Sequence, residues 1–284
     1  MKKLLLFLVA TCLFGEISEP IHSSISTYYE NKNYMNSKQK KDAITYGIDV
    51  DIHHKNSAYK ITYEQSKADT KKPPLKEDLK NKKLFLKYGY TLNNKIHFNL
   101  NYIKVLSDNI AITTGGKVYG AGITYTTDKK LSLNFTQFYT NYKDFNVYQS
   151  DFRCDFKTKL DGLKLKISSI TKYISLKDDK HNSFTKNAQK EYLTTGFKLH
   201  AHYKSYHFGS GFFIGKRVFA IMNEGSKLQH HAMEFDRTYA VGVGKTISNF
   251  IFRMQYIYQR ATELPSKNEN VEIETIRMIL NYKF

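Results

Sequence analysis

The sequence predicts an all-β protein, a single closed antiparallel up-and-down barrel of about 14 strands, with 12 or 16 strands as the alternatives. Three observations predict it. Apolar and polar residues alternate at period two in segment after segment. The connections between these segments alternate between long and short. All four prolines, at positions 20, 73, 74 and 265, fall outside the segments, as a closed hydrogen-bond ladder requires.

The first fifteen residues differ from the rest of the chain. An apolar run from Leu4 to Phe14 follows Lys2 and Lys3 and ends at Gly15. At about eleven residues it is too short for a membrane-spanning helix, which needs roughly 20. A short basic start, an apolar core and a small residue are typical of a secretory signal peptide. We therefore expect a cleaved signal peptide at 1–15 and one barrel domain at 16–284.

The remaining chain has no helical periodicity of useful length, and its two-faced segments read as strands. The clearest are residues 44–52, 131–135, 152–156, 163–167 and 250–258, each with apolar or aromatic residues on one face and polar residues on the other. Strands are expected to begin near residues 23, 42, 58, 82, 96, 115, 131, 146, 163, 189, 206, 230, 249 and 271.

The connections carry a second pattern. After odd-numbered strands they are mostly long and polar, at residues 32–41, 69–81, 107–114, 177–188, 222–229 and 261–270. After even-numbered strands they are short, at residues 54–57, 92–95, 128–130, 161–162, 205 and 247–248. The connection at 142–145 is the exception, since it follows an odd strand and is short. A barrel in an outer membrane has this sidedness, with tight turns on the periplasmic side. A soluble β-sandwich is the alternative, but its loops need not alternate in length.

The chain ends on a strong alternation of apolar residues, in the sequence IRMILNYKF at 276–284. Leu280, Tyr282 and Phe284 resemble the C-terminal assembly signal of bacterial outer-membrane proteins, although the glycine often found earlier in that signal is missing. At the level of pattern, the whole chain is similar to monomeric fourteen-stranded porins. The resemblance implies a Gram-negative outer membrane, a barrel-assembly machinery that recognises the terminal residues, and contact with outer-membrane lipids and lipopolysaccharide.

The charge balance suggests an anionic partner. The formal net charge is +18, from 44 Lys and Arg against 26 Asp and Glu. Export argues against nucleic acid, which leaves anionic lipids or small anionic or hydrophilic solutes. If the apolar stripe of each strand faces lipid, the opposite face lines the lumen and is about two-to-one basic. The predicted pore-lining basic residues are Arg153, Lys157, Lys159, Lys164, Lys166, Lys172, Lys198, Lys204, Arg217, Arg253 and Arg277. The alternative is that many of them form a structural network of cross-strand pairs.

The expected function is passive diffusion of small hydrophilic solutes, favouring anions, with no cofactor and no reaction. Fourteen strands should leave a modest pore. About nineteen residues for each strand with its connection leave no room for a plug domain and little for a large constricting loop. His200 and His202 share the lumen face and could bind a metal, although a protonatable pore lining is the better interpretation.

Two other functions stay open at this point. His181 and Ser183 have the His-x-Ser spacing of outer-membrane lipid hydrolases, but they stand in a polar loop. A structural or surface-interaction barrel, whose loops do the work, is the third possibility.

Overall fold

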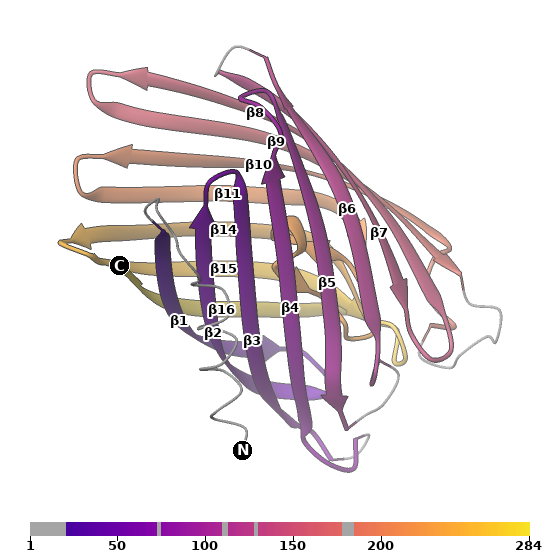
Figure 1. Cartoon of the computed structure of the whole chain (residues 1–284). Helices are drawn as coiled ribbons and strands as arrows, with labels where there is room; N and C mark the ends of the chain where they lie inside the picture. The colour runs from indigo at the N-terminus through magenta and orange to yellow at the C-terminus, as the bar shows by residue number, and fades with distance from the viewer. Residues whose placement is uncertain (1–20, 73–74, 110–112, 128–129, 178–184) are drawn as a thin grey trace, which may run out of the picture.

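A computed structural model describes residues 21–72, 75–109, 113–127, 130–177 and 185–284. The chain forms one closed antiparallel barrel of fourteen strands, as Figure 1 shows, so the predicted fold class is confirmed. The predicted signal peptide and the His181–Ser183 pair lie outside the described residues. Among the residues described, no helix is long and apolar enough to cross a membrane.

The expected strand starts are met to within three residues. The barrel strands are β1 (His22–Met35), β2 (Lys40–His54), β3 (Ser57–Thr70), β4 (Leu79–Thr91), β5 (Ile96–Asp108), β6 (Lys117–Thr126), β7 (Leu131–Asn141), β8 (Asn146–Leu160), β9 (Leu163–Lys177), β10 (Glu191–Tyr203), β11 (Tyr206–Arg217), β14 (Met233–Ile247), β15 (Phe250–Glu263) and β16 (Asn268–Lys283). Between β11 and β14 stand the short strands β12 (Ile221–Met222) and β13 (Lys227–Leu228), joined by the 3₁₀ turn η1 (Asn223–Gly225).

The first and last strands close the barrel. β1 and β16 pair from Ser24 opposite Lys283 to Met35 opposite Glu272. The pairing continues to the last residue, because the backbone N–H of Phe284 donates to the carbonyl of Ser23 at 3.0 Å. β1 begins and β16 ends at the same end of the barrel, which is also the end of the tight turns (Figure 1). We call it the short-turn end, and the opposite end the long-loop end.

The outer face of the barrel is apolar, as period two predicts. On β16 the outward side chains of Ile276, Met278 and Leu280 are all well exposed, while Thr275, on the opposite face, is buried. Phe284 is 71% exposed. A contiguous stripe of exposed apolar side chains is unusual on a water-facing surface. A strand that alternates in this way matches a lipid-facing wall.

Tyrosines and phenylalanines gather at both ends of this apolar wall. Towards the long-loop end, the outward rings of Tyr102 and Tyr119 lie 5.5 Å apart. At the short-turn end, the rings of Phe250 and Tyr282 lie 4.8 Å apart, and Phe284 meets Tyr282 edge-on at 4.9 Å. Aromatic girdles of this kind mark the two interfaces of a membrane-spanning barrel.

The expectation that little room remains for a constricting loop is wrong. Residues 218–232, between β11 and β14, fold into the lumen, and we call them the inserted loop. Phe219 and Ile221 are almost completely buried there. Phe219 packs on Phe145, in the connection between β7 and β8, with ring centroids 4.8 Å apart. Ile221 belongs to a buried cluster that includes Phe138 on the lumen side of β7. Burying each such side chain is worth about 1.5–3 kcal/mol, which is why the loop lies inside the barrel rather than in solvent.

Candidate functional site: a basic pore beside an inserted loop

The inserted loop is fixed to the barrel wall by buried hydrogen bonds. The side-chain amide of Gln149, on β8, donates to the carbonyl of Ile221 at 2.7 Å and accepts from its backbone N–H at 2.8 Å. Lys172, on β9, donates to the same carbonyl at 3.0 Å. Both polar groups of the Ile221 backbone are therefore satisfied by side chains of the wall, which is what a segment buried away from the sheet requires.

The tip of the loop is held by charges. Glu224 forms an ion pair with Arg153, and its backbone carbonyl accepts from Lys87 at 3.1 Å. Lys198 donates to the side chain of Asn223 at 2.9 Å. Burial alone would raise the pKa of the Glu224 carboxyl, but Arg153, Lys87 and other nearby cations lower it below its ordinary value. The carboxylate is therefore ionised at neutral pH and remains paired.

The loop leaves one side of the lumen open. A cavity of about 520 Å³ separates the loop from the wall made by β11, β14, β15, β16, β1 and β2. On β11 and β14 this wall presents small residues, because Gly209, Gly211, Ala240 and Gly242 face the cavity. Among the described residues, the Asp and Glu that line the cavity are Asp49, Asp51 and Glu224. The Lys and Arg that line it are Lys60, Lys198, Lys227, Arg217, Arg253 and Arg277. The lining of this cavity, which we call the passage, is thus about two-to-one basic.

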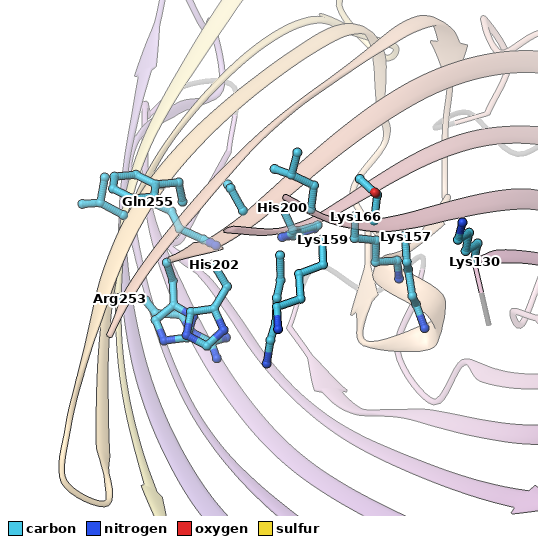
Figure 2. A pocket seen from close by; sticks show the side chains of 17 residues that line it. Lys130, Lys157, Lys159, Lys166, His200, His202, Arg253 and Gln255 are labelled. Carbon is cyan, nitrogen blue, oxygen red and sulfur yellow. The ribbon is translucent and has the colours of Figure 1, made fainter. Parts of the chain in front are cut away.

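A second cavity, of about 780 Å³, lies nearer the short-turn end, and we call it the basic mouth. Figure 2 shows how lysines, histidines and an arginine converge on it from neighbouring strands. Its charged and imidazole residues are Lys130, Lys157, Lys159, Lys164, Lys166, Arg253, His200, His202 and His207. No Asp or Glu is among the described residues that line it.

The register of the strands concentrates positive charge in the mouth. Lys157 stands directly opposite Lys166, and Lys159 directly opposite Lys164. Like charges in these positions repel each other. The charge of Lys166 is offset by Asp155, whose Oδ2 lies 3.1 Å from the Lys166 Nζ. The Asp155 carboxylate does not line the cavity. A cluster of cations that the wall itself does not neutralise attracts anions from solution.

Most of the predicted basic residues occupy one of three places. Lys157, Lys159, Lys164, Lys166 and Arg253 line the basic mouth. Lys198, Arg217, Arg253 and Arg277 line the passage. Arg153 and Lys172 hold the inserted loop and are largely buried behind it. Lys204 lies in the turn between β10 and β11, where its ammonium group sits 5.3 Å from the ring of Tyr203.

Two arginines of the passage are held by aromatic rings. Arg277 lies over Tyr28, 4.2 Å from the ring centroid, and its Nε is 3.5 Å from a carboxylate oxygen of Glu30. Arg217 is completely buried between Phe213 and Phe235, 5.7 and 5.5 Å from their centroids. Arg217 is therefore fixed in the wall, whereas Arg253 has no ion pair among the described residues and faces both cavities.

His200 and His202 share the lumen face, as the sequence predicts. His202 stacks on His207 of the next strand, with ring centroids 4.3 Å apart. Within the described ranges, no group of three or more His, Cys, Asp or Glu could hold a metal ion. The imidazoles thus extend the row of lysines across β10 and β11.

Sequence reasoning missed the inserted loop, its anchor Gln149 and the mouth residue Lys130. A signal for the loop was present. Ile103 and Val105 lie on the lumen side of β5, opposite the stripe that carries Tyr102, and both are buried. Apolar residues on both faces of a barrel strand indicate that something apolar packs inside.

No protein-family model matches the chain, and no curated protein matches it. Solved structures do. A bacterial polysaccharide outer-membrane secretin covers 95% of this chain and 100% of its own, with 6% identity and a TM-score of 0.54. The match to the NanC porin covers 91% of this chain and 100% of the porin chain, with 11% identity and a TM-score of 0.50. The chain has the fold of an outer-membrane porin. OccK8 (OprE) of Pseudomonas aeruginosa also matches, at 13% identity, 93% and 97% coverage and a TM-score of 0.45. At such identities the likeness concerns the barrel alone and not the residues inside it.

Proposed function

We propose that this protein is a passive diffusion channel in the outer membrane of a Gram-negative bacterium, and that it favours small anionic solutes. The observation that carries the proposal is the basic mouth, a cavity where Lys157, Lys159, Lys164 and Arg253 form no ion pair among the described residues, and where no described lining residue is Asp or Glu. Two proteins with this fold, a porin and a polysaccharide secretin of the outer membrane, support a transport function.

The mechanism is electrostatic and involves no reaction. A solute passes between the tip of the inserted loop and the glycine-rich wall, and it also passes the basic mouth. Lys and Arg side chains lower the energy of an anion along this path, as basic rings do in anion-selective pores. The Debye length is about 8 Å at physiological salt, so charges that line a narrow passage are only partly screened from a solute inside it.

The two groups of basic residues have different roles in this proposal. Arg153 and Lys172 are paired with Glu224 and Asp151, and they position the loop. Lys157, Lys159 and Lys164 have no ion pair among the described residues. Selectivity is therefore assigned to the mouth, and the cross-strand network around the loop is structural. The lipid-hydrolase alternative depends on His181 and Ser183, and the cavities that the described residues form offer it no support.

Replacing Lys157, Lys159, Lys164 and Lys166 together by Glu tests the proposal. In a planar bilayer with a salt gradient, the parent should give an anion-favouring reversal potential. The variant should shift it towards cations, most strongly at low salt, because four charges are reversed where solutes pass.

The matched control reverses four exposed lysines in connections at the long-loop end, Lys76, Lys143, Lys190 and Lys267. Its reversal potential should stay near that of the parent. A parent that prefers cations, or a control that shifts as far as the mouth variant, would show that the mouth does not select the solute.

A further inference from the structure

The outer face of the barrel carries four lysines at the long-loop end of three adjacent strands. We call Lys80 and Lys82 on β4, Lys104 on β5 and Lys117 on β6 the lysine patch. Their sequence neighbours point into the barrel: Ile103 and Val105, on either side of Lys104, are 1% and 0% exposed. Because successive side chains of a strand point to opposite faces, the four lysines project outward from the wall.

The patch lies beside the aromatic girdle. Tyr102 is two residues from Lys104, and Tyr119 is two residues from Lys117, so each lysine stands about 7 Å from a girdle tyrosine along its strand. The two tyrosine rings are in contact across the strands. Since girdle tyrosines lie at the membrane interface, the lysines lie at the level of the lipid headgroups.

The register sets like charges against each other. Lys104 is directly opposite Lys117. Leu84 pairs with Lys104, and a register shift between Lys82 and Lys83 places Lys82 opposite Ser107, near the same end of β5. Like charges directly opposite each other destabilise a sheet. No carboxylate among the described residues forms an ion pair with any of the four. By contrast, Lys67, opposite Lys80, pairs with Asp69 at 2.8 Å and with Asp78 at 3.4 Å.

We propose that the lysine patch binds the phosphate groups of a phosphorylated glycolipid, the lipid A part of lipopolysaccharide, in the outer leaflet. Phosphates placed among the four ammonium groups would offset their mutual repulsion, because charge-assisted hydrogen bonds to phosphate are strong.

The arrangement fits a headgroup with two phosphates better than a phospholipid with one. Lys80 and Lys82 form one pair along β4, and Lys104 and Lys117 form a second pair across β5 and β6. The two pairs lie on adjoining strands, since β4 pairs with β5 and β5 with β6, so two phosphates of one headgroup can each meet one pair. Below the patch, Leu86 and Leu100 are 38% and 55% exposed and provide an apolar surface for acyl chains.

The experiment measures lipid binding to the refolded protein in detergent by native mass spectrometry. The probes are bisphosphorylated lipid A, fully dephosphorylated lipid A and phosphatidylglycerol. The parent should bind bisphosphorylated lipid A at least about tenfold more tightly than either other lipid. Replacing Lys80, Lys82, Lys104 and Lys117 together by Gln should remove that preference.

The matched control replaces four exposed lysines of the short-turn end by Gln, namely Lys55, Lys95, Lys204 and Lys245. It loses the same net charge and should keep the parent's affinity. Without lipid, the patch variant should unfold at the parent's temperature or above it, because repulsion is relieved. Equal binding of the three lipids by the parent overturns the proposal, and so does an equal loss of lipid A binding in the control. A preference for phosphatidylglycerol also overturns it and would assign the patch to a different leaflet.

Discussion

Gly209 shows at the scale of a single residue how the passage stays open. A Cβ atom built there would meet nothing nearer than 3.7 Å, the distance to Nδ1 of His200, and the backbone does not adopt a positive φ. Gly215, further along β11, differs from Gly209 in its backbone conformation. Its φ of 100° requires glycine. Neither packing nor backbone geometry demands glycine at 209, although glycine weakens a strand interior. The residue is explained by the space that it leaves in the lumen.

Replacing Gly209 by Leu should therefore lower the single-channel conductance without preventing folding. The new side chain would enter the passage opposite the loop tip and displace water and ions there. Heat-modifiable migration on gels reports whether the barrel folds. The control is Ser210→Leu, whose side chain projects to the lipid face. An unchanged conductance in Gly209→Leu, with normal folding, would place the solute path elsewhere.

The mouth residues were predictable at this scale, and the loop contacts were not. Period two alone places Lys157, Lys159, Lys164 and Lys166 on one face, and the cost of lysine in hydrocarbon decides that the face is the lumen. The pairing of Arg153 with Glu224 joins residues 71 positions apart through a loop whose path no local pattern specifies.

At the scale of the element, the inserted loop depends on Gln149. Replacing Gln149 by Ala removes its two hydrogen bonds to the Ile221 backbone and a third to Asp151, and it leaves the buried N–H of Ile221 without its partner. A buried unpaired group costs about 1–3 kcal/mol, which should let the loop leave its position part of the time. We expect a higher mean conductance with larger current fluctuations in a planar bilayer.

The control for the loop is Gln137→Ala. Gln137 faces outward on β7 and accepts from Ser150 at 2.7 Å on the exposed surface, so its loss should leave the current trace unchanged. If Gln149→Ala also conducts like the parent, the hydrogen bonds to Ile221 do not govern the position of the loop. The loop would then be held by the burial of Phe219 and Ile221 and by the ion pair and hydrogen bonds at its tip.

The loop escaped prediction because its apolar residues look like a strand. Residues 218–222, Val-Phe-Ala-Ile-Met, extend β11 in the sequence as a continuous apolar run, so the sequence predicts a connection at 222–229 only. In the structure, β11 loses its register between Ile214 and Arg217, and the chain leaves the wall after Arg217. An average of about nineteen residues per strand conceals one long connection, since the tight turns elsewhere release residues to it.

At the scale of the whole molecule, the fold class was predictable because the membrane constrains every strand in the same way. Backbone groups in hydrocarbon must pair within the protein, and only helices or closed barrels achieve this. Fourteen two-faced segments, with no apolar run long enough for a helix, therefore lead to one architecture. What fills the lumen is not subject to that constraint, which is why the wall was predicted and its interior was predicted only in part.

Orientation is the remaining property of the whole molecule, and it follows from the two ends of the barrel. β1 begins and β16 ends at the short-turn end, and assembly from the periplasm keeps that end inside while the longer loops cross. Epitope tags inserted after Lys76 and after Lys267 should be labelled on intact cells, and a tag at Asp161 only after permeabilisation. Labelling of all three in permeabilised cells controls for expression. Surface labelling at Asp161 alone would show that the barrel has the opposite orientation. The lysine patch would then face the periplasmic leaflet, where lipid A is absent.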